Sequence, residues 1–128
     1  MNPSQPLTSG FWNGDIHYDN INNYIFSESD IITFHAYCDV QCTMNFINKM
    51  VSFKRPVICT EYMARQTGSK FITHLPVFKQ NKIWAINWGF VFGRTQTYYP
   101  WSSKQGDPVP ALWFHDVVHA NGTSYDKN

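Results

Sequence analysis

Several features that would place this 128-residue chain in a common functional class are missing. The sequence has no run of basic residues and a net charge of only +1, so nucleic-acid binding has no electrostatic support. No apolar segment approaches the ~20 residues of a membrane-spanning helix, and we expect no membrane partner. Residues 1–5 have neither a charged nor an apolar region, so we expect no signal peptide there.

Cysteine is scarce and odd in number, and no CxxC pair occurs. Cys38 and Cys42 are spaced to lie on one helical turn, but two thiolates without a nearby His make a poor zinc site. Cys59 stands in an apolar segment, where a free Cys behaves as a small hydrophobe. We therefore assign all three cysteines to structural roles and expect neither a metal nor a cofactor.

Aromatic residues, in contrast, are abundant and reach 17% of the chain. Large aromatic side chains fill cores, and this explains most of them. The C–H faces of sugar rings also stack on aromatic rings, so carbohydrate sites accumulate such residues. The composition is therefore compatible with a folded chain that binds sugars.

The chain alternates β-forming runs with helical patterns, which favours a parallel sheet with right-handed crossovers. Val40, Met44, Ile47 and Val51 recur at helical spacing after Asp39, a good N-cap. Four strands are expected, in residues 1–12, 31–37, 56–60 and 83–88. Helices are expected at 19–26, from 40 to about 54, at 69–78 with a kink or an interruption at Pro76, and at 111–119.

Three of the expected strands end in polar or aromatic side chains. His35 and Tyr37 alternate along one strand and so point the same way, Glu61 follows the next, and Trp88 ends the last. In (β/α)8 enzymes the chemistry lies at the C-terminal ends of parallel strands. A surface position for Glu61 and core positions for His35 and Tyr37 are the structural alternatives.

Strand ends that carry His-x-Tyr, then Glu, then Trp in this order resemble the last part of a retaining glycoside hydrolase. The similar family is the (β/α)8-barrel superfamily that includes the family 5 cellulases and mannanases. The resemblance spans residues 5–125 and implies an α/β fold, the C-terminal half (strands five to eight) of a barrel, as one domain over residues 1–128. A complete barrel needs about 250 residues. The missing N-terminal half-barrel, or self-association, is therefore an expected partner.

The resemblance also implies residue roles. Glu61 matches the catalytic nucleophile, Tyr37 the residue that orients it, and His35 a residue lining the sugar site. The acid/base Glu of the family belongs to an Asn-Glu pair, which the sequence lacks, so the isolated chain is expected to be inactive. The expected substrate-binding residues are Trp12, Trp88, Arg94, Gln96, Tyr99 and Trp101.

These features predict a fragment of a retaining glycosidase that cleaves O-glycosidic bonds in a β-linked glycan of the xylan, mannan or glucan type. The parent enzyme would be secreted or periplasmic, whereas the sequence does not locate this chain. One alternative is a non-catalytic carbohydrate-binding protein that uses the aromatic strand-end surface. Another is a metal hydrolase, although adjacent His115 and Asp116 would point in different directions on a helix.

Overall fold

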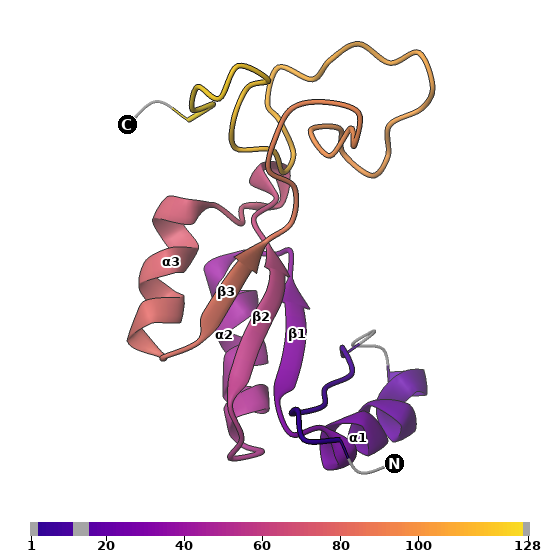
Figure 1. Ribbon diagram of the computed structural model, residues 1–128, viewed down its shortest axis with the longest axis vertical. Helices are drawn as coiled ribbons and strands as arrows, with labels where there is room; N and C mark the ends of the chain where they lie inside the picture. Colours follow the sequence, from indigo (N-terminus) through magenta and orange to yellow (C-terminus); the bar gives the residue numbers. More distant parts are fainter. Residues whose placement is uncertain (1–2, 12–15, 127–128) are drawn as a thin grey trace.

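A computed structural model describes residues 3–11 and 16–126, and in these residues three parallel strands form one sheet in the order β1-β2-β3 (Figure 1). The strands are β1 (Ile32–Ala36), β2 (Val57–Tyr62) and β3 (Trp84–Asn87). The helices are α1 (Asp19–Glu28), α2 (Val40–Val51) and α3 (Phe71–Gln80), with short 3-10 helices η1 (Ile16–Tyr18) and η2 (Arg65–Thr67). No helix in the described ranges is both long and apolar enough to cross a membrane.

The half-barrel implied by the resemblance is wrong. The described residues form a three-stranded sheet, and the segment expected as a first strand contributes only one parallel bridge, between Gly10 and Thr33. Pro3 and Pro6 lack the backbone N–H groups that a strand in the sheet would donate, which limits pairing in this segment. Trp12 lies outside the described residues.

The helix expected at residues 111–119 is also absent from the structure, where turns and short bridges occupy this segment. Trp113, Phe114, His115 and Asp116 are all buried in succession. An amphipathic helix buries only one stripe of its surface, so four consecutive buried residues require an irregular backbone enclosed on several sides. The long segment from residue 88 to 126 forms a largely irregular cap beyond the C-terminal ends of the strands (Figure 1).

Helix α2 begins as the sequence predicts, with the Asp39 carboxylate accepting the backbone N–H of Cys42 at 2.9 Å. Helix α3 continues through Pro76 without interruption. The missing N–H of Pro76 would have bonded the Ile72 carbonyl, and both residues are exposed, so water can bind that carbonyl.

Helices α2 and α3 pack on one face of the sheet and enclose the hydrophobic core with it (Figure 1). The core includes Phe34 of β1, Ile47 of α2, Cys59 of β2 and Phe78 of α3. The opposite face of the sheet is more open, and Trp84 and Ile86 of β3 are exposed there.

A bulge in β2 decides which residues reach this open face. Phe34 pairs with Cys59 but His35 pairs with Glu61, so β2 contains one more residue than β1 at this point. In a regular strand, Glu61 would share the core-facing side with Cys59. The extra residue instead places Tyr62 in the core and turns Glu61 toward the face that carries His35.

Candidate functional site

Three of the expected catalytic residues meet at the C-terminal ends of β1 and β2. The Tyr37 hydroxyl donates a hydrogen bond to Glu61 Oε2 at 2.6 Å, and His35 Nδ1 lies 3.4 Å from the same oxygen. The Glu61 side chain is 24% exposed, so it is partly desolvated but still accessible. Burial, then the hydrogen bond and charge of Glu61, raise the pKa of Tyr37 well above its usual range. Tyr37 is therefore a neutral donor that holds one oxygen of the carboxylate in place.

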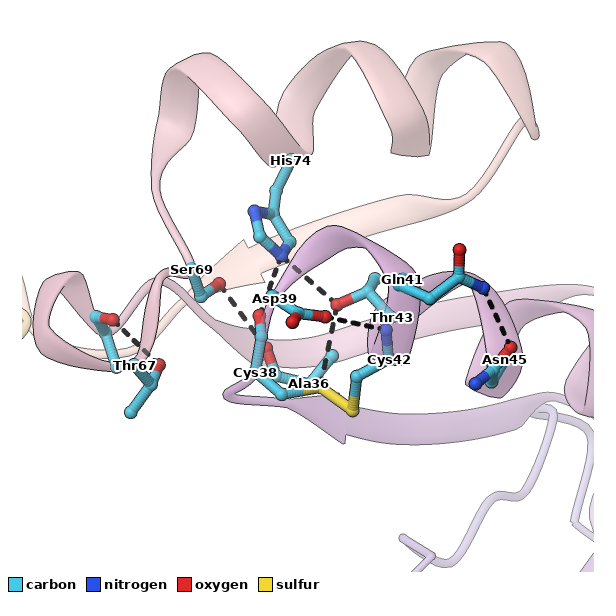
Figure 2. Close-up of a disulfide and its surroundings, with 11 residues drawn as sticks. Ala36, Cys38, Asp39, Gln41, Cys42, Thr43, Asn45, Thr67, Ser69 and His74 are labelled. Atoms are coloured by element: carbon cyan, nitrogen blue, oxygen red, sulfur yellow. Dashed lines mark hydrogen bonds between the residues drawn. A yellow bond between two sulfur atoms is a disulfide. The ribbon is translucent and has the colours of Figure 1, made fainter.

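A disulfide fixes the backbone immediately after Tyr37. Cys38, in the loop after β1, is bonded to Cys42 in the first turn of α2, a link that the sequence did not predict (Figure 2). Asp39 lies inside this five-residue ring and caps α2. The link joins the strand end that carries Tyr37 to the start of a packed helix.

His74 of α3 holds the same loop from the other side, pointing down at it in Figure 2. Its Nδ1 accepts the Lys70 backbone N–H at 3.3 Å, so the proton resides on Nε2, which donates to the Cys38 carbonyl at 3.0 Å. Burial lowers the pKa of His74, which favours this neutral form. His74 is thus a structural residue.

The cap contributes an aromatic wall beside Tyr37. The Trp101 ring lies 5.0 Å from the Tyr37 ring, and the His115 ring lies 5.3 Å from it. Edge-to-face contacts of this kind stabilise the relative positions of the rings. Through them the cap is joined directly to the residue that orients Glu61.

Arg65, just beyond β2, fastens the cap to the sheet. Its buried guanidinium donates to the carbonyls of Trp113 and Asp116 at 3.2 and 2.9 Å and forms a two-point ion pair with Asp126. The Arg65 backbone N–H also donates to the Phe114 carbonyl at 3.0 Å. These contacts place the segment 113–116 against the end of β2, which brings His115 toward Tyr37.

The cap encloses a pocket of about 680 Å³. We call it the aromatic pocket; its lining includes Trp88, Gln96, Thr97, Tyr99, Trp101 and His115. Four of the expected substrate-binding residues therefore come together. Arg94 is exposed and does not line the pocket, and Trp12 lies outside the described residues.

His115 also lines the pocket, although the sequence analysis does not include it among the expected sugar-binding residues. It is only 2% exposed, and its Nδ1 lies 2.9 Å from the Met63 carbonyl. Met63 adopts a positive φ of 67°, an unfavourable conformation for a side chain of this size, and its N–H is bonded to Ser69 Oγ. No local sequence pattern signals this contact, because Met63 and His115 are far apart along the chain.

Cys59 and Tyr62, the core residues of β2 nearest to Glu61, do not titrate near neutral pH. Burial raises the pKa of the Cys59 thiol to about 12, and burial with the Cys59 charge raises the pKa of Tyr62 to about 12. Cys59 is therefore a protonated core residue, and its Sγ donates to the Glu61 carbonyl at 3.3 Å. Both residues support the bulge without taking part in ionic chemistry.

Comparison with known proteins identifies no relative: no family model matches the chain, and no match is found among curated proteins or solved structures. The glycoside hydrolase resemblance thus has no support beyond the residues that carry it. The function of the site must follow from its own geometry.

Proposed function

We propose that this chain binds a β-linked oligosaccharide in the aromatic pocket and that Glu61 is the nucleophile of a retaining glycosidase. The observation that carries the proposal is the Tyr37–Glu61 hydrogen bond of 2.6 Å, at the C-terminal ends of parallel strands and beside an aromatic pocket. A phenol that donates a hydrogen bond to one carboxylate oxygen gives the carboxylate a fixed direction of attack.

In the proposed step, an oxygen of Glu61 bonds to the anomeric carbon while the bond from that carbon to the leaving oxygen breaks. Trp88, Tyr99 and Trp101 would stack on the sugar rings, and Gln96 would bond to hydroxyl groups. The acid that protonates the leaving oxygen is not assigned to this chain. Glu28, the other Glu of the sequence, is at the end of α1, which precedes β1 and lies at the opposite end of the sheet from Glu61 (Figure 1).

The disulfide indicates the kind of cellular compartment in which the protein resides. Disulfides persist in oxidising compartments and are rare in the reducing cytosol. The Cys38–Cys42 link therefore favours a secreted or periplasmic protein, which is where enzymes that degrade external glycans act.

Activated aryl glycosides test the catalytic proposal without the missing acid. Dinitrophenyl β-xylosides, β-mannosides and β-glucosides need no protonation to release the phenolate, so a nucleophile alone can react with them. We expect release by the wild-type chain and a loss of roughly three powers of ten or more in Glu61→Ala. Azide should restore release in that variant and give the α-glycosyl azide. Glu28→Ala is the matched control and should retain the wild-type rate.

A second candidate function, sugar binding without catalysis, is favoured by one observation: Glu61 does not line the aromatic pocket. Under this alternative the wild type binds oligosaccharides but releases no phenolate, and azide has no effect on Glu61→Ala. Equal release by wild type and Glu61→Ala would contradict the catalytic proposal as well.

A further inference from the structure

The hydrogen bond of His115 fixes which ring nitrogen carries the proton. The Met63 carbonyl can only accept, so Nδ1, at 2.9 Å, must be the protonated nitrogen. Burial lowers the pKa of His115 and outweighs the opposing effects of Met63, Asp116 and Glu61, which favours a neutral ring. In this neutral form Nε2 is a hydrogen-bond acceptor.

This acceptor has no partner. His115 Nε2 is buried without a hydrogen bond from any described residue, although His115 lines the aromatic pocket. Oδ1 of Asn87 and Oδ2 of Asp116 are also buried without a hydrogen bond from any described residue, but neither residue lines the pocket. Buried polar atoms are almost always paired, because leaving one unpaired costs its lost hydration. An unpaired acceptor in the lining of a pocket therefore points to a ligand that brings a donor.

The three residues that carry these unpaired acceptors lie close to Gly89. Asn87 Nδ2 donates to the Gly89 carbonyl, and a Cβ atom on Gly89 would lie 2.8 Å from both Asp116 Oδ1 and His115 Cβ. His115 is the residue of this group that lines the pocket, and its unpaired atom is an acceptor. A hydroxyl group, which can donate, complements it. A metal ion would also do so, but no three His, Cys, Asp or Glu side chains gather as a metal site in the described part of the chain.

Three rings cover the His115 imidazole and control access to it. The rings of Phe114, Tyr37 and Trp101 lie 4.5, 5.3 and 5.8 Å away. Phe114 is buried and Tyr37 is held by Glu61, whereas Trp101 is 65% exposed. Trp101 is therefore the ring that can move aside, and it can then stack on the sugar that enters.

We propose that His115 is a ligand-binding residue, whose Nε2 accepts a hydrogen bond from a sugar hydroxyl once Trp101 has moved. The inference rests on the proposed carbohydrate binding, but it does not depend on catalysis by Glu61. It assigns to the aromatic pocket a recognition group that would favour glycans with a hydroxyl at this position over analogues that lack it.

Oligosaccharide binding to the whole chain tests this assignment. Xylohexaose, mannohexaose and cellohexaose are titrated into wild type, His115→Asn and His119→Asn by calorimetry. Asn at position 115 can keep an N–H donor for the Met63 carbonyl but removes the nitrogen that corresponds to Nε2. We expect affinity for the bound oligosaccharide to fall about tenfold or more in His115→Asn and to be unchanged in His119→Asn.

Imidazole nitrogen NMR provides a readout that needs no variant and so survives a folding defect in His115→Asn. The free chain should show Nε2 of His115 as an unprotonated nitrogen, and the oligosaccharide should shift this resonance upfield as it accepts a hydrogen bond. The role of His115 is overturned if the wild type binds the sugar but the Nε2 resonance does not move. It is also overturned if His115→Asn binds with the full wild-type affinity. Either result leaves the proposed sugar binding intact. Failure of the wild type to bind any of the three sugars overturns the proposed function and this inference together.

Discussion

The Tyr37 hydroxyl lies 2.6 Å from Glu61 Oε2, although the two residues belong to neighbouring strand ends and are separated by 24 positions. The bulge in β2 makes this contact possible, because it turns Glu61 to the face that carries His35. The disulfide and His74 then fix the loop that follows Tyr37. The geometry of the carboxylate thus depends on interactions that lie on either side of it.

Glu61→Gln should lower the pKa of Tyr37, because it removes a charge that opposes ionisation of the phenol. The pKa should remain above the usual value of about 10, since burial is the largest cause of its elevation. The measurement is an NMR titration of the Tyr ring carbons. Tyr62, whose pKa is raised by burial and Cys59, is the internal control and should not respond. Ordinary titration of Tyr37 in the wild type would contradict the structure.

The stability of the chain should fall as the pH drops below about 6.5, the unperturbed pKa of His. The pKa values of His74 and His115 are lowered in the folded chain, so the unfolded chain takes up protons first. Stability from these residues is complete above pH ~6.5 and is lost as the pH falls toward their folded pKa values. The slope is at most about 1.4 kcal/mol per pH unit for each histidine.

Urea unfolding at a series of pH values measures this slope. His115→Asn should reduce it, and His119→Asn is the matched control, which should keep the wild-type slope. A stability that is independent of pH between about 7 and 5 would show that these two histidines are not buried in their neutral forms.

Gly89→Ala should disturb the packing behind His115, a residue that lines the aromatic pocket. Gly89 has a φ of +82°, and an added Cβ would lie 2.8 Å from both Asp116 Oδ1 and His115 Cβ. Backbone strain should cost about 1–2 kcal/mol of unfolding free energy and overpacking about 1–3 kcal/mol more. Gly122→Ala separates the two effects, because Gly122 has a φ of +84° and nothing within 4 Å of the added Cβ. Equal losses in the two variants, measured by urea unfolding, would contradict close packing at Gly89.

Reduction of the Cys38–Cys42 disulfide should destabilise the fold by roughly 2 kcal/mol, a small effect because the closed loop is short. The double variant with Ser at both positions should show the same loss and no further response to dithiothreitol. Thermal melts with and without the reductant provide the measurement. Cys59 is the control thiol: its burial and raised pKa should keep it unreactive until the chain unfolds. Three reactive thiols in the chain before the reductant is added would show that Cys38 and Cys42 are not bonded.

The sequence predicted the local part of this architecture. Helix α2 follows from the spacing of Val40, Met44, Ile47 and Val51, and its N-cap from Asp39. Three strands were also located, because β-forming runs end in recognisable breaks. The candidate residues lie at the ends of these strands. Side chains alternate between the two faces of a strand, which predicts that His35 and Tyr37 point the same way.

What the sequence could not predict depends on contacts between distant segments. The β2 bulge is visible only in the register with β1, where Glu61 rather than Thr60 pairs with His35. The burial of His115 requires the hydrogen bond to Met63, 52 positions away. The half-barrel was an extrapolation from a resemblance, and within residues 3–11 the first strand that it needed is reduced to the bridge at Gly10.

Covalent labelling tests the central claim, nucleophilic attack by Glu61, most directly. The wild-type chain is incubated with dinitrophenyl 2-deoxy-2-fluoro-β-glycosides of the glucose, mannose and xylose series, then digested and analysed by peptide mass spectrometry. These reagents trap the glycosyl-enzyme and require no acid from the protein. The account predicts one fluoroglycosyl group, carried by Glu61, that is absent from Glu61→Gln. Labelling of a different residue, or no labelling of a chain that binds the same sugar, would contradict it.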